Sequence, residues 1–340
     1  MQNQSIPNSS IESLPVDLLT EHAISYIENI DELLEDVKSQ CNYYDLVPNL
    51  NMVHYTKDLG IEAEIRPLNQ DSSVIEDGNT KFQICFSANF GQFLWSVGLY
   101  LSSYMDNIVQ IPLMNLLGTN THGYVARPQD VEYANKQFFL GRQLVQGNNF
   151  ASFWIGNHIG NPGNFQFAIE KANGMYCGSI AFIYAHEFAH SCLGHTQVQN
   201  TVARSIADEI EADNLAMDYI EKTFNSSDGF TYKAEVAATL SALLLEGADT
   251  ISGGGTHPDM DLRIDSLMNR LNLHECDILW GFMASAIRLW LLVYGGFTPQ
   301  EDLQIPPFES YKEMYETYRD KLTLVRRRRY PQVLPRPWEI

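Results

Sequence analysis

The feature that most constrains the fold is a pair of histidines four positions apart inside an apolar run. Residues 180–193 are mostly apolar, and within them His186, Glu187 and His190 form the pattern H-E-x-x-H. Residues four apart lie on one face of an α-helix, so both imidazoles can reach one metal ion while Glu187 stands beside it. A chance occurrence is disfavoured, because burying several ionisable groups together is costly unless something compensates them. The pattern therefore predicts a buried helix with two zinc ligands and a general base.

An acidic cluster on the next predicted helix offers the third ligand that a catalytic zinc site requires. The cluster spans residues 208–213. The predicted buried side of this helix is marked by four apolar residues, Ile206, Ile210, Met217 and Ile220. Glu209 and Asp213 share a face, so we expect Glu209 to bind the metal and Asp213 to accept the spare ring N–H of a ligand histidine. Asp208 and Glu211 are expected to be surface acids.

Two other residues near the motif are weaker ligand candidates. His195 does not fit the longer pattern H-E-x-x-H-x-x-G-x-x-H, because Gly194 comes one position late and His195 one position early. Gly194 instead suits the end of the helix. Cys192 lies off the face shared by the two histidines, which favours a packed core thiol. Glu209 is therefore the preferred third ligand.

A third element consists of His257-Pro258 followed by Arg263-Ile264. Proline is favoured in the first turn of a helix, and Thr256 or His257 could cap it. From the residues alone, this element predicts a turn that leads into a helix.

Taken in order, the three elements resemble a group of gluzincin peptidases. Their motifs H-E-x-x-H, E-x-x-A-D and H-P-x-x-x-x-R-I are matched here by His186-Glu187-x-x-His190, Glu209-x-x-Ala212-Asp213 and His257-Pro258-x-x-x-x-Arg263-Ile264. HtpX-like membrane peptidases show this order, as do the soluble Lit-type peptidases of phage exclusion. The chain is more similar to the Lit-type group, because it lacks clear membrane spans. The resemblance covers roughly residues 175–271.

The resemblance implies both a site and a biological role. It makes Glu209 the third zinc ligand and Asp213 its support, and it puts His257 and Arg263 near the substrate or the developing oxyanion. It implies a zinc-dependent endopeptidase that stays latent until a phage-derived activator triggers it. The implied substrate is a host translation factor.

The pattern of apolar residues changes near residue 170. Residues 1–170 combine a helix-like segment at 16–39 with strand-like runs at 82–86 and 138–145, which predicts an α+β region for substrate or partner recognition. Residues 171–340 read as a helical zinc peptidase region, with helices predicted at 178–193, 201–223, 232–246, 259–271, 277–294 and 311–324. We therefore expect an α+β, zincin-like fold whose C-terminal half is mainly helical.

Composition and charge exclude several classes of function. The formal net charge of -20 makes nucleic acid an unfavourable partner, because such binding depends on neutralising phosphates with Lys and Arg. The arginine run at 326–329 is an exception and is expected to be solvated. Five scattered cysteines without a C-x-x-C pair favour a reducing compartment. We expect a cytoplasmic protein whose partner is a protein or peptide substrate.

One apolar stretch raises the question of a membrane span. Residues 278–294 are apolar but contain Arg288, whose burial in a bilayer would cost roughly 2.5 to 3.5 kcal/mol or more. Residues 1–10 lack the basic start and apolar core of a secretory signal. The sequence therefore predicts a buried helix at 278–294 and no membrane span.

Two other functions stay open. A zinc-containing binding protein without proteolysis would need a closed site, usually of Cys and His ligands, and no cysteine pair stands nearby. A metallopeptidase that cleaves a DNA-bound repressor would share H-E-x-x-H, but the His257 and Arg263 element favours the first reading.

Overall fold

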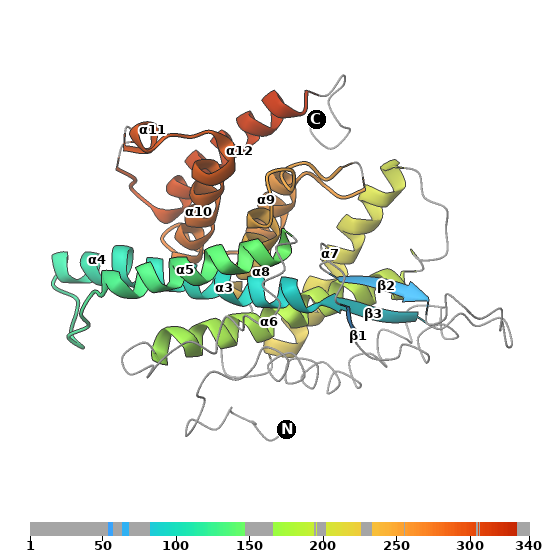
Figure 1. Cartoon of the computed structure of the whole chain (residues 1–340), viewed down its shortest axis with the longest axis horizontal. Helices are drawn as coiled ribbons and strands as arrows, with labels where there is room; N and C mark the ends of the chain where they lie inside the picture. The colour runs from blue at the N-terminus through green and yellow to red at the C-terminus, as the bar shows by residue number, and fades with distance from the viewer. Residues whose placement is uncertain are drawn as a thin grey trace, which may run out of the picture. The chain divides into compact units, whose positions relative to one another are not determined.

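The computed structural model describes residues 54–56, 63–67, 82–146, 166–193, 195, 202–225, 233–254, 256–303, 305 and 307–331. These residues are mainly helical (Figure 1). The strands are β1 (His54–Thr56), β2 (Ala63–Pro67) and β3 (Phe82–Ser87). The helices up to residue 192 are α3 (Ala88–Tyr104), the π-helix Met105–Gln110, α4 (Ile111–Leu116), α5 (Pro128–Val145) and α6 (Gln166–Cys192). The later helices are α7 (Val202–Asn225), α8 (Lys233–Leu245), α9 (Met260–Arg270), α10 (Ile278–Trp290), the π-helix Leu291–Gly295, α11 (Pro299–Leu303) and α12 (Tyr311–Arg329).

The chain forms two compact units. Unit 1 contains Met1–Val198 and Ala212–Thr239, and unit 2 contains Gln199–Glu211 and Leu240–Ile340. Two of the three unit boundaries fall inside helices, since α7 and α8 each continue without a break from one unit into the other. The division expected near residue 170 stays a prediction.

The predicted α+β, zincin-like fold with a mixed N-terminal region is wrong for the residues that the structure describes, which are mainly helical. Strand is confined there to short segments between residues 54 and 87, in which β3 pairs in parallel with β1 and antiparallel with β2. The strand predicted at 82–86 is confirmed as β3. The helix predicted at 16–39 lies outside the described residues.

The second predicted strand, at 138–145, is part of helix α5. Its apolar residues continue a helical pattern that begins earlier, because Ala134, Phe138, Gly141 and Leu144 are all buried at spacings of three and four. Pro128 in the first turn suits a helix start. Residues 138–145 taken alone do not show this helical spacing of the apolar residues.

Helix α3 forms the core of unit 1 together with α5 and α6, against both of which it packs. Its aromatic-rich sequence is buried, with Phe90, Phe93 and Trp95 at most 3% exposed. A Cβ on Gly141 of α5 would lie 3.1 Å from the Phe93 Cα, so glycine permits this close approach of the two helices. Core packing therefore accounts for the aromatic stretch.

Helix α6 carries the H-E-x-x-H motif and helix α7 carries the acidic cluster. Helix α7 lies close to its predicted range, whereas α6 begins at Gln166 rather than at residue 178. α6 is apolar on most sides and largely buried, as expected of a central helix. Phe188 on α6 packs against Tyr219 on α7, with ring centroids 6.0 Å apart. The predicted buried face of α7 is wrong at Ile210, which is 38% exposed, but correct at Ile206, Met217 and Ile220.

Helices α10 and α12 pack together in unit 2. Residues 278–295 form the one stretch of the described chain that is long and apolar enough to cross a membrane, and 61% of it is buried inside the protein. Arg288 within it donates to Asp302 over 2.8 Å from Nε to Oδ2. The prediction of a buried helix is confirmed by this burial.

Candidate metal centre

Helix α6 presents His186 and His190 on one face. Their Nε2 atoms are 3.1 Å apart and their ring centroids 4.7 Å apart. Two nitrogens that bind one tetrahedral zinc at about 2.0–2.1 Å would lie about 3.3 Å from each other. The two imidazoles therefore have nearly the spacing of ligands that share an ion.

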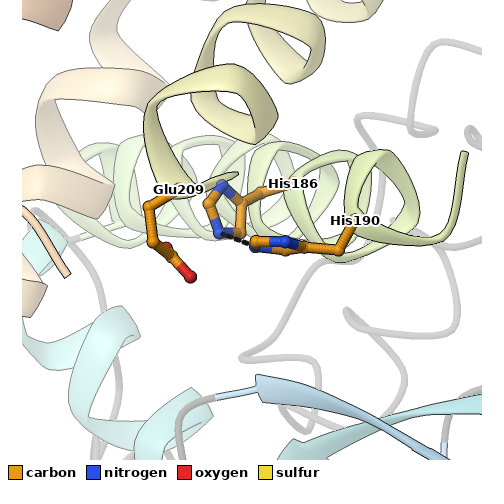
Figure 2. Close-up of side chains that lie close together, drawn as sticks. All are labelled: His186, His190 and Glu209. Atoms are coloured by element: carbon orange, nitrogen blue, oxygen red, sulfur yellow. Dashed lines mark hydrogen bonds between the residues drawn. The ribbon is translucent and has the colours of Figure 1, made fainter. Parts of the chain in front are cut away.

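Helix α7 contributes a carboxylate to the same place. One ligand atom each from His186, His190 and Glu209 lie within 4.8 Å of one another. Figure 2 shows the three side chains converging from the two helices. Two imidazoles and one carboxylate are a donor set typical of catalytic zinc, in which three protein ligands leave one position open. The residues present therefore fit a zinc ion.

Asp213 supports the first of the two imidazoles. Its Oδ1 lies 2.9 Å from His186 Nδ1, and both side chains are buried. A carboxylate at this distance favours the proton on His186 Nδ1, which leaves Nε2, the atom that faces His190, with the free lone pair. Asp213 stands one helical turn after Glu209, so one face of α7 supplies both a ligand and a support.

The three remaining predicted site residues lie at different places. Glu187 follows His186 on α6 and is partly buried. The exposed His257 lies near Glu209, with 3.6 Å from Nε2 to Oε1. Arg263 lies in the first half of α9 and is partly buried. The geometry thus groups His186, His190, Glu209, Asp213 and His257.

The loop before α9 differs from its predicted form. Asp259, rather than Thr256 or His257, is the N-cap residue, and Pro258 precedes the helix. A Cβ on Gly253 would lie 1.8 Å from the carbonyl oxygen of His257, so only glycine fits this tight loop. The loop holds His257 through its own backbone: His257 N donates to Gly253 O over 2.9 Å.

Residues 84–283 match the family model of peptidase U49, which covers more than half of the 340 residues. The chain belongs to the peptidase U49 family. All seven predicted site residues lie within the matched region. No curated protein and no solved structure matches the chain. Membership of the U49 family supports a protease.

Sequence reasoning missed two polar residues beside this centre of the U49 chain. Asp208, predicted as a surface acid, is only 2% exposed and pairs with Arg204, with 2.7 Å from Oδ1 to Nε. His195, set aside as a ligand, is 7% exposed and lies with its Nδ1 3.0 Å from His190 Nδ1. Because α6 ends at Cys192, His195 is beyond the helix, and helical periodicity gives no signal for this contact. The side chain of Cys192 lies outside the described residues.

Proposed function

We propose that this U49 peptidase is a zinc-dependent endopeptidase of the gluzincin type, which hydrolyses a peptide bond in a protein substrate. The observation that carries the proposal is the convergence of His186, His190 and Glu209 from α6 and α7. Three ligands with an open position suit catalysis, whereas structural zinc sites usually close all four positions. The geometry therefore favours catalysis over a zinc-containing binding protein.

The chemistry follows from the side chains around the ion. When bound, zinc would lower the pKa of water to about 7 and polarise the scissile carbonyl. Glu187 takes a proton from the attacking water and later passes it to the leaving amine. Asp213 keeps His186 in the tautomer whose Nε2 is free to bind. His257 lies exposed beside Glu209, which supports a role as donor to the oxyanion.

The motif resemblance extends the proposal to biology. The order of the three motifs supports a cytoplasmic, Lit-type enzyme, triggered by a phage component, that cleaves a host translation factor. Arg263 enters this proposal through the resemblance alone.

The decisive experiment compares the wild type with Glu187→Gln, and uses Glu170→Gln as control because Glu170 is exposed on the same helix. Each protein is assayed for bound zinc and then incubated with bacterial lysates, prepared with and without phage infection, in which new N-termini are mapped. We expect Glu187→Gln to keep zinc but lose cleavage by about 10²- to 10⁴-fold. The control should behave as the wild type. Full cleavage by Glu187→Gln would remove Glu187 from the mechanism, and a wild type without zinc would refute the metal centre.

A further inference from the structure

Each imidazole of the candidate centre has a polar neighbour at its Nδ1 atom, on the side away from the other imidazole. The neighbour of His186 is Asp213. The neighbour of His190 is His195, with 3.0 Å between the two Nδ1 atoms. Their ring centroids are 5.2 Å apart and their planes are inclined by 68°, so the contact joins ring edges rather than stacked faces. His195 is buried, which fits a fixed contact rather than a solvated side chain.

The contact determines where the protons lie. His190 directs its Nε2 toward His186 Nε2, so a metal bound there leaves the His190 proton on Nδ1. His190 Nδ1–H then donates to His195 Nδ1, which must be the unprotonated nitrogen of its ring. The proton of a neutral His195 ring is consequently on Nε2.

Two carboxylates of α7 lie next to His195. Ligand atoms of His195, Asp208 and Glu211 fall within 4.8 Å of one another. A histidine and two carboxylates are also a set of groups that can hold a cation. However, the Arg204 guanidinium already lies 2.7 Å from Asp208 Oδ1 and neutralises it. Because Asp208 is already paired, the group does not carry a second metal site.

We propose that His195 is a positioning residue, which holds His190 in the tautomer and orientation required of a zinc ligand. This inference rests on the proposed zinc centre. It predicts that removing the acceptor behind His190 weakens metal binding, although His195 itself does not bind the ion. Loss of such a supporting contact typically costs 10- to 100-fold in metal affinity.

The test compares His195→Leu, which removes the acceptor, with His195→Asn, whose amide oxygen can stand near the place of Nδ1. His274→Leu is the matched control, because His274 is exposed and lies on the loop before α10. Zinc affinity is measured by competition with a chelator, and the absorption spectrum of the cobalt-substituted proteins reports ligand geometry. We expect about 10- to 100-fold weaker zinc binding and an altered cobalt spectrum for His195→Leu. His195→Asn should recover most of the affinity, and the control should match the wild type.

Two further readouts separate the possible failures. The metal-free proteins are melted in chelator, where a merely structural role of His195 would lower the Tm of His195→Leu without changing its zinc affinity. That result, or equal affinities in all variants, would overturn the inference while leaving the zinc centre intact. Zinc stoichiometry is expected to be one per chain. Two ions per wild-type chain with one in His195→Leu would instead make His195 a ligand, and a wild type that binds none would refute the proposed function as well.

Discussion

Glu235 is a buried carboxyl group outside the candidate metal centre. It lies in the first turn of α8, is 5% exposed and packs against Gly178 of α6. Burial raises the pKa of Glu235 from its usual 4.5 to about 8. Burial, together with the nearby Glu235, also raises the pKa of the Cys177 thiol to about 12. Glu235 is therefore protonated in the folded protein at neutral pH, and Cys177 is unreactive toward thiol reagents.

This carboxyl makes stability depend on pH. Because its folded pKa of about 8 lies above its unfolded value of 4.5, the folded state binds the extra proton between these values. The contribution to stability is fully present below pH 4.5 and is lost as pH rises through 8. We expect Glu235→Gln, which stays neutral, to lose stability less steeply than the wild type between pH 5 and 9. Urea unfolding in the presence of a chelator, at several pH values, measures the difference.

Glu316→Gln is the control for this measurement, because Glu316 is exposed on α12. It should follow the wild-type pH dependence. Parallel curves for the wild type and Glu235→Gln would show that Glu235 ionises without a penalty in the folded state.

At the scale of elements, α6 and α8 approach each other at one glycine. A Cβ added to Gly178 would lie 1.9 Å from Glu235 Cγ and 2.6 Å from its Cβ, and Ser179 Oγ donates to the Glu235 carbonyl over 3.0 Å. Gly174, one turn earlier on α6, has nothing within 4 Å of the same position. The two glycines therefore separate the effect of close packing from that of helix propensity.

We expect Gly178→Ala to destabilise the protein by about 1–3 kcal/mol, because the new methyl group forces α8 away from α6. Gly174→Ala should stabilise by about 0.5–1 kcal/mol, since alanine is the better helix former. Chemical denaturation measures both changes. Equal effects of the two substitutions would mean that α6 and α8 do not meet at Gly178. Because His186 lies two turns further along α6, zinc affinity of Gly178→Ala also shows whether this contact matters for the centre.

The sequence predicts best those helices whose apolar residues can be recognised along their whole length. Helices α7, α8, α9, α10 and α12 were predicted close to their observed bounds, whereas α6 begins at Gln166, well before its predicted start at residue 178. The H-E-x-x-H pattern placed two side chains that the structure brings together. Helix α5 was misread because its apolar residues at 138–145 are adjacent, and only the longer window reveals the helical spacing. Asp208 and His195 were misjudged for another reason. Their burial depends on how α6 ends and how α7 packs, which no local period encodes.

At the scale of the whole molecule, two buried aspartates in the region that matches the peptidase family pair with an arginine outside that region. Asp259 and Asp261 lie within the match and are each 1% exposed. Their countercharge is Arg326 on α12, beyond the match: it lies 2.5 Å from Asp259 Oδ2 and 2.8 Å from Asp261 Oδ1. Thr323 also donates to Asp261 Oδ2 over 2.7 Å. The arginine run at 326–329 therefore begins with a buried residue, although its other members are exposed as expected.

The expected consequence is a large penalty for removing Arg326. In Arg326→Met the apolar stem is largely kept, but the two aspartates remain buried without their partner, so we expect a loss of about 3–5 kcal/mol in the free energy of unfolding. Arg327→Met, at an exposed neighbour, should change it by less than about 0.5 kcal/mol. Adding Asp259→Asn and Asp261→Asn to Arg326→Met should restore part of the loss, because the uncompensated charges are then gone. Urea unfolding of the four proteins tests this, and a combined variant no more stable than Arg326→Met would attribute the loss to packing. Asp259 also accepts from the Gly253 N–H in the loop that holds His257, so the arginine on the last described helix helps to fix a residue beside Glu209.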